Sequence, residues 1–348
     1  MSQASETTGA NTSGGGANHR YLRLQEMARF KNIVFSPRRM VTGAYAGRHA
    51  TPQRGHSVEF ADYREYMPGD EVGDVDWKLY GRSDKLFIKL FEHYSDMSVT
   101  LLIDGSASMR YAGINQGRVV TSTDSDGGSW LRKAANTVTN RLKNNSRDVL
   151  NTSKYDLACR MAAAIGFLTV KQQDKVALAI ARNGLADYLP PGGSISHLYK
   201  VLTLMESQDV AEKADLANSI KELALRNKRR GVVVIFSDLE EPQEEVLKAM
   251  AMLTHRGNEV VVFQVMHQDE LKLPDLSDAL IEDSETGQRV RLNVDDVREA
   301  YEAQVHDRIN SWSAALRAKR IDHNLIPTTV PYYQALQRYL FSRAGGVS

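Results

Sequence analysis

The chain has 348 residues, 42% of them hydrophobic and 25% charged, and its formal net charge is +1 at pH 7. Near-neutral charge gives no global field for nucleic acid or a membrane surface, and the single cysteine, Cys159, excludes a disulfide framework. Because there is no apolar run of the roughly 20 residues that a spanning helix needs, and no apolar signal-peptide core, we expect a cytoplasmic protein with no membrane span and no nucleic-acid partner.

The N-terminal part of the chain divides into two segments. Residues 1–19 are small and polar and predict a disordered tail. Residues 20–97 form an N-terminal segment that contains two adjacent acidic residues of interest, Asp74 and Asp76. These could be a metal pair, but helix capping and ion pairing are favoured by roughly four to one, because structural ion pairs outnumber functional sites.

A first apolar strand is predicted at Leu86–Glu92, and it could pair with Val99–Ile103 as an edge hairpin. The second run, Val99–Ile103, is short and continuously apolar, as in a fully buried parallel strand. It ends abruptly in Asp104, and two hydroxyls follow at Ser106 and Ser108. The strand's carboxyl end is where open α/β sheets bind ligands.

One carboxylate and two hydroxyls on a tight loop are hard oxygen donors, which suit Mg²⁺ or Mn²⁺. The pattern by itself also fits a plain strand before a serine-capped helix. The next stretch, residues 112–153, is rich in Gly, Ser, Thr, Asn and Asp. It predicts a solvated insertion with one short helix at Trp130–Leu142, and a partner-docking flap is the slightly less favoured alternative.

From Lys154 onward, helical stripes alternate with apolar strands, which predicts a parallel sheet with crossover connections. Helices are expected around Leu157–Leu168, Leu198–Met205 and Leu216–Leu223, then after Pro242, after Asn293 and over Tyr332–Ser342. Strands are expected at Val176–Ala181, Ala186–Leu189, Gly231–Asp238, Glu259–Val265 and Asn324–Thr329, with a hairpin over Ile281–Leu292. Cys159 lies on an apolar helix face and is expected to be an inert core thiol.

Two of these strands end in aspartate, at Asp104 and Asp238. We expect the two carboxylates to lie side by side at the carboxyl edge of the sheet, on either side of a switch point. The hypothesis of an ion site there also requires Ser106 and Ser108 to reach solvent.

The alternation from Val99 onward resembles a von Willebrand factor A-type domain, and Asp104-Gly-Ser-Ala-Ser108 matches the opening of its metal-ion-dependent adhesion site (MIDAS). The earlier stretches Glu59–Asp70, Val75–Lys78 and Leu86–Glu92 resemble the segment ahead of that domain in domain-of-unknown-function family 58. The resemblance implies an α/β fold: a von Willebrand factor A-like (Rossmann-type), mostly parallel sheet flanked by helices over residues 98–345, with an N-terminal extension.

The resemblance also implies a set of site residues. Ser106 and Ser108 would bind the metal directly, and Asp104 and Asp238 would act through water. The remaining hydroxyl would come from the loop after Gly192-Gly193, where Ser194 is favoured over Ser196. The implied cofactor is Mg²⁺ or Mn²⁺, which, with mostly neutral ligands, stays electrophilic enough to recruit a carboxylate from a partner.

The implied function is a non-enzymatic protein-interaction module that docks a partner's Asp or Glu. Relatives commonly occur beside MoxR-type AAA ATPases, which implies an adaptor or co-chaperone for such a machine. One alternative is a Mg²⁺-dependent phosphohydrolase using Asp104, and another is a scaffold with a vestigial, metal-free site. Against an enzyme, the sequence has no second acid two residues after Asp104, no Gly-x-x-x-x-Gly-Lys loop, no histidines at metal-ligand spacing and no Gly-x-Ser-x-Gly elbow.

Overall fold

The computed structural model describes residues 19–22, 30, 35, 59–66, 75–83, 85–92, 97–113, 152–208, 214–227, 230–274, 278–282 and 289–343. Its centre is a six-stranded sheet with the strand order β10-β7-β6-β3-β4-β5. The strands are β3 (Ser98–Asp104), β4 (Lys175–Arg182), β5 (Gly184–Gly192), β6 (Val232–Ser237), β7 (Glu259–Met266) and β10 (Asp322–Pro327). All neighbours are parallel except β4 and β5, which are antiparallel.

Counted along the chain, this is the order 3-2-1-4-5-6 of a doubly wound sheet. The strand order reverses at β3, which pairs with β4 on one side and with β6 on the other. The predicted fold class, a mostly parallel α/β sheet, is therefore confirmed. It also follows that the carboxyl ends of β3 and β6 form the switch point.

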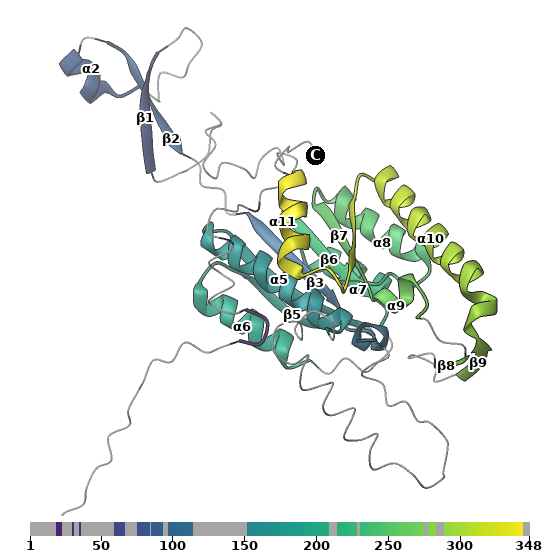
Figure 1. The fold of residues 1–348 in the computed structure, drawn as a ribbon. Coiled ribbons are helices and arrows are strands. Elements are labelled where there is room, and N and C mark those ends of the chain that lie inside the picture. Colours follow the sequence, from purple (N-terminus) through teal and green to yellow (C-terminus); the bar gives the residue numbers. More distant parts are fainter. Residues whose placement is uncertain are drawn as a thin grey trace, which may run out of the picture.

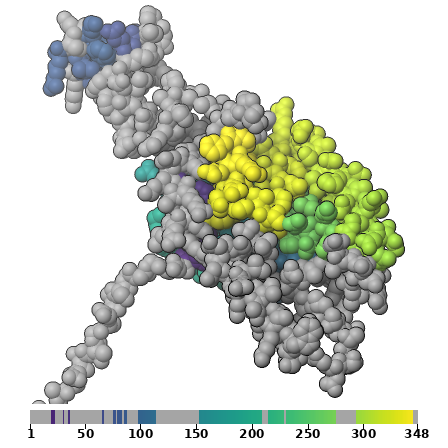
Figure 2. Space-filling model, in the orientation of Figure 1, coloured from purple at the N-terminus to yellow at the C-terminus, as the bar shows by residue number. Residues whose placement is uncertain are grey.

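Helices cover both faces of the sheet (Figure 1). One face packs on α5 (Lys154–Lys171), α6 (Ile195–Glu206) and α11 (Tyr332–Arg343), and the other on α7 (Leu216–Arg226), α8 (Gln243–His255) and α10 (Val294–Ala318). Side chains of β3 alternate between the two layers: Val99 and Leu101 join the first core and Leu102 joins the second. In the space-filling view, the C-terminal part of the described chain, coloured green to yellow, forms one continuous surface (Figure 2).

The expected hairpin between Leu86–Glu92 and Val99–Ile103 is wrong. The first of these strands is β2 (Phe87–Glu92), and it pairs antiparallel with β1 (Glu59–Glu65) in a separate two-stranded sheet. The second strand, β3, instead pairs with β4 and β6 in the interior of the main sheet, where helices cover its apolar side chains on both faces.

The described N-terminal residues lie in two parts of the structure. Tyr21, Phe30 and Phe35 are buried in the same core as α5 and α11. Further along, Asp76 accepts a hydrogen bond from the Leu79 N–H at 3.2 Å, at the start of α2 (Trp77–Ser83). This is the capping role that was favoured for it, whereas Asp74 lies outside the described residues.

Several smaller predictions are confirmed. Asn293 caps α10 through a hydrogen bond from the Asp295 N–H, and the predicted hairpin is β8 (Asp278–Glu282) with β9 (Arg289–Asn293). Cys159 is a free, buried thiol on α5, and burial raises its pKa. Within the described part of the chain, none of the helices combines the length and apolarity needed to cross a membrane. Tail residues 1–18 and residues 114–151 of the predicted insertion, with its expected helix, lie outside the described residues.

Candidate functional site

The carboxyl ends of β3 and β6 meet at the switch point, as predicted. Ile103 is in register with Phe236, so Asp104 and Ser237 are the next residues along the two strands. The Ser237 hydroxyl donates a hydrogen bond to Asp104 Oδ2 at 2.6 Å. Asp238 follows immediately, and its charge raises the pKa of Asp104. We name Asp104, Ser106, Ser108, Ser237 and Asp238 the carboxyl-edge corner.

A tight loop brings the two predicted serines to this corner. The Ser106 N–H donates to Asp104 Oδ1 at 2.9 Å, and the Ser106 and Ser108 hydroxyl oxygens lie 2.9 Å apart. Gly105 permits the turn, because a Cβ at this position would lie 2.9 Å from the Ala181 carbonyl oxygen. Of the two serines that were expected to reach solvent, Ser106 is buried and only Ser108 is partly exposed, so the expectation is wrong for Ser106 and the corner opens to solvent at Ser108.

The serine oxygens fit a small divalent ion. Magnesium binds oxygen at about 2.0–2.1 Å in an octahedron, so two adjacent ligand oxygens lie about 2.9 Å apart. The Ser106 and Ser108 hydroxyls are hydrogen-bonded to each other at 2.9 Å, a distance that equals this ligand spacing and is also that of an ordinary hydrogen bond. Among the described residues, no cluster of three or more His, Cys, Asp or Glu side chains could hold a metal. Any ion here would therefore depend on the two hydroxyls and Asp104 together.

The negative charge of the Asp104 carboxylate has little compensation. Its residue is only 3% exposed, and among the described residues it has hydrogen-bond donors but no ion-pair partner. Burial, together with the nearby charge of Asp238, raises its pKa to about 7, although the Ser237 and Ser106 hydrogen bonds oppose this rise. A cation beside Asp104 would stabilise its ionised form.

Lys154 is a buried charged residue beside the corner that the sequence analysis missed. It is the first residue of α5, and its side chain is fully buried. Its ammonium lies 2.7 Å from Asp238 Oδ2 and 2.5 Å from Glu270 Oε1. Burial lowers the pKa of Lys154, but the two carboxylates outweigh burial and raise it overall. Lys154 is in helical phase with the apolar stripe that begins at Leu157, and a lysine in such a stripe was the available signal.

The structure does not bring Ser194 to the corner, so this prediction is wrong. Because β5 runs antiparallel, its end at Gly192 pairs with Val176 at the amino end of β4, whereas Asp104 pairs with Ala181 at the other end. Five residues of strand separate these positions, about 17 Å. Ser194 instead caps α6 by accepting a hydrogen bond from the His197 N–H. Ser196, the less favoured candidate, lies in the same α6 and is excluded for the same reason.

The connection that does reach the carboxyl edge precedes α7. The Asp215 N–H donates to the carbonyl oxygen of Arg182, the last residue of β4. The described residues of this connection are Ser207 and Gln208, next to α6, and Ala214 and Asp215, next to α7. The Ser207 hydroxyl donates a hydrogen bond to the Leu204 carbonyl oxygen. The two residues next to α7 supply no hydroxyl, because Ala214 is a buried alanine and Asp215 caps the helix.

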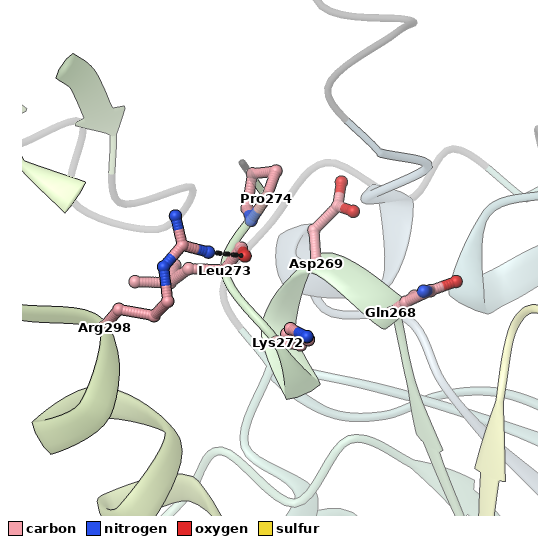
Figure 3. A pocket seen from close by; sticks show the side chains of 6 residues that line it. All are labelled: Gln268, Asp269, Lys272, Leu273, Pro274 and Arg298. Atoms are coloured by element: carbon pink, nitrogen blue, oxygen red, sulfur yellow. Dashed lines mark hydrogen bonds between the residues drawn. The ribbon is translucent and has the colours of Figure 1, made fainter. Parts of the chain in front are cut away.

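A short helix extends the polar network away from the corner. Glu270 lies on α9 (Gln268–Leu271), which begins with a capping box formed by His267 and Glu270. Asp269 of the same helix accepts a hydrogen bond from the Tyr111 hydroxyl at 3.0 Å. The same helix α9 borders an open pocket of about 480 Å³ (Figure 3). The pocket is lined by Gln268, Asp269, Lys272, Leu273, Pro274 and Arg298.

The doubly wound sheet with its Asp-x-Ser-x-Ser loop at the switch point defines a von Willebrand factor A-like domain. A family model described as "Protein of unknown function DUF58" matches residues 62–122 and 138–310, more than half of the chain. The chain therefore belongs to the DUF58 family, as the sequence resemblance predicted.

Similar proteins include the uncharacterized protein Rv1480 of Mycobacterium tuberculosis (strain ATCC 25618 / H37Rv). It is 22% identical over 322 residues, which cover 89% of this chain and 90% of that protein. Among solved structures, an aerotolerance-related membrane protein from Bacteroides fragilis NCTC 9343 has 14% identity and a TM-score of 0.39, covering 71% of this chain and 100% of that one. The SpRpn10 VWA domain has 12% identity and a TM-score of 0.33, covering 70% and 94%.

Proposed function

We propose that this chain is a non-enzymatic protein-interaction module that docks an Asp or Glu side chain of a partner protein at the carboxyl-edge corner. A Mg²⁺ or Mn²⁺ ion held directly by Ser106 and Ser108, and through water by Asp104, would supply the positive charge that receives the partner's carboxylate. The observation that carries the proposal is the pair of neighbouring serine hydroxyls beside a buried carboxylate that has no ion-pair partner among the described residues. Both hydroxyls are neutral, so such an ion keeps charge for an outside ligand.

The proposed setting is the cytoplasm, with a MoxR-type AAA ATPase as the partner and the chain as its adaptor or co-chaperone. The partner follows from the family resemblance given above. One cysteine, reduced and buried, suits a reducing compartment. The open Ser108 side of the corner is the direction from which the partner's side chain would approach.

A binding role is preferred to the alternative of a Mg²⁺-dependent phosphohydrolase. Asp104 would be its nucleophile or base, yet each of its carboxylate oxygens already accepts a hydrogen bond and the residue is nearly fully buried. Phosphatase assays on the wild type and Asp104→Ala test this choice. Metal-dependent turnover that is lost in the variant would contradict the proposal.

A scaffold with a metal-free corner is the second candidate, and one observation favours it. The Lys154 ammonium already neutralises Asp238, one of the two carboxylates expected to face the metal. In that case Mg²⁺ and Mn²⁺ would produce neither heat in a calorimetric titration nor a thermal shift.

The proposed docking is tested with the purified MoxR-type ATPase of the native host. We expect the wild type to bind it in Mg²⁺, to lose binding in excess chelator and to regain it when Mg²⁺ is restored. Asp104→Asn should remove binding, whereas the matched control Ser194→Ala, at the opposite edge of the sheet, should bind like the wild type. Binding that persists in chelator, or in Asp104→Asn, contradicts the proposed ion-dependent docking.

A further inference from the structure

Lys154 adds a positive charge beside the corner, and the proposed function gives this charge no role. Its ammonium contacts Asp238 and Glu270, and Asp238 is close enough to Asp104 to raise the pKa of that carboxyl. The cluster thus contains three carboxylates and one ammonium, a net charge of −2 when all three carboxylates are ionised. A divalent ion bound there brings this charge to zero.

We infer that Lys154 makes binding of the divalent ion and binding of an acidic partner depend on each other. This inference rests on the proposed function and concerns the same corner. With Lys154 present, the ion brings the cluster to zero net charge, so no net negative charge repels a carboxylate from outside. Without Lys154, the cluster with its ion keeps a net charge of −1, which repels an outside carboxylate and weakens its binding.

The lysine is fixed in the corner, so its charge cannot move away when an ion binds. Its side chain is fully buried, and both carboxylates hold its ammonium. Its backbone N–H donates to the Tyr111 carbonyl oxygen at 3.1 Å, and Tyr111 ends the 3₁₀ turn η3 (Ala107–Arg110) that contains Ser108. The ammonium and the serine loop are therefore joined through adjacent backbone.

Burial strengthens the electrostatic effect of the Lys154 charge. Asp238 has a side chain that is 2% exposed, so water screens its contact with Lys154 poorly. Charges in such a setting interact much more strongly than in bulk water. Repulsion between the ammonium and a divalent ion should therefore lower the affinity for the ion, and a partner's carboxylate should recover part of it.

The test measures Mn²⁺ affinity by electron paramagnetic resonance, in excess acetate as the simplest carboxylate and in an equal concentration of chloride. Lys154→Met is compared with Lys248→Met, which removes an exposed lysine on α8. In chloride, we expect Lys154→Met to bind Mn²⁺ at least tenfold more tightly than the wild type. Acetate should tighten Mn²⁺ binding at least threefold in the wild type and in Lys248→Met, and less than twofold in Lys154→Met.

Glu270→Gln is a second variant, for which the expected change in Mn²⁺ affinity is in the opposite direction. Lys154 stays paired with Asp238, and the cluster loses one negative charge. A glutamine can still accept the capping-box hydrogen bond from the His267 N–H. We expect at least threefold weaker Mn²⁺ binding in chloride and a larger gain from acetate. If Lys154→Met does not fold, this variant decides the inference.

The outcomes separate this inference from the proposed function. Equal Mn²⁺ affinities in Lys154→Met and Lys248→Met, or an unchanged affinity in Glu270→Gln, overturn the inference and leave ion-dependent docking in place. Mn²⁺ binding that survives Asp104→Asn contradicts the proposed site. Absence of Mn²⁺ binding in the wild type and in every variant, with acetate or without, overturns both.

Discussion

Replacing Lys154 by Met tests how strongly the buried ammonium stabilises the folded protein. Methionine has a similar length and no charge, so the change removes the positive partner of Asp238 and Glu270 with little change in volume. Asp238 is then left ionised with a side chain that is only 2% exposed, whereas Glu270, at 25%, can be partly hydrated. The destabilisation should therefore come mainly from Asp238.

Removing one partner of a buried ion pair costs about 3–5 kcal/mol, because the other charge stays buried without compensation. We expect a loss in this range for Lys154→Met. Adding Asp238→Asn removes the stranded charge, so the double variant should be about 2–3 kcal/mol more stable than Lys154→Met alone. Asp238→Asn alone should cost less than this, because the ammonium keeps its contact with Glu270.

Urea denaturation at pH 7 in chelator, followed by circular dichroism, gives the free energies of unfolding. The slopes should be equal among the variants, so that midpoints report stability. Lys248→Met is the control, since its exposed pair with Glu244 should contribute almost nothing. The reasoning is refuted if Lys154→Met loses no more stability than this control, or if the double variant is no more stable than Lys154→Met.

Three further predictions concern single residues. Ser194→Ala should lower the free energy of unfolding by about 1 kcal/mol through loss of the α6 cap and leave the Mn²⁺ affinity unchanged. Weakened Mn²⁺ binding would contradict the position of Ser194 at the opposite edge of the sheet. Gly105→Ala should cost about 1–3 kcal/mol, because the new Cβ meets the Ala181 carbonyl oxygen, while Gly81→Ala, with open space around it, should cost nothing in the same denaturation assay. The Asp104 pKa of about 7 lies above its ordinary value of 3.8, so the folded protein binds more protons between these values, and its stability in chelator should fall as pH rises from about 4 to about 7. Asp104→Asn should flatten this dependence, and an unchanged slope would contradict the raised pKa.

The main sheet could be predicted because its strands are continuous apolar runs separated by helical stripes. Val99–Ile103 and Val232–Phe236 have no polar residue that would mark an exposed face, other than Thr100, and such runs belong inside a parallel sheet. The polar residues that end them then had to meet at one edge. This reasoning predicted the neighbourhood of Asp104 and Asp238 without any coordinates.

The position of Ser194 was predicted wrongly because the direction of β5 was not considered. β4 ends at Arg182 and β5 begins at Gly184, so only Asn183 lies between them. A parallel crossover needs a dozen or more residues, whereas so short a connection permits only a hairpin, and Gly184 adopts the positive φ of such a turn. The signal was present in the short spacing of the two strands.

Lys154 could not be assigned to the corner from sequence alone. Its partners Asp238 and Glu270 are 84 and 116 residues away along the chain, and only the packing of α5 against the sheet brings them together. The phase of Lys154 with the apolar stripe predicts burial, and a buried lysine requires a carboxylate partner. The identity of that partner depends on the fold.

The central claim is that Asp104, Ser106 and Ser108 hold a divalent ion. The most direct test is calorimetric titration of Mn²⁺ into the wild type and into a Ser106→Ala/Ser108→Ala variant, both in excess acetate. We predict one Mn²⁺ per wild-type chain and no measurable binding by the double variant, with circular dichroism showing that both are folded. Equal heats in the two titrations, or none in the wild type, would contradict the claim.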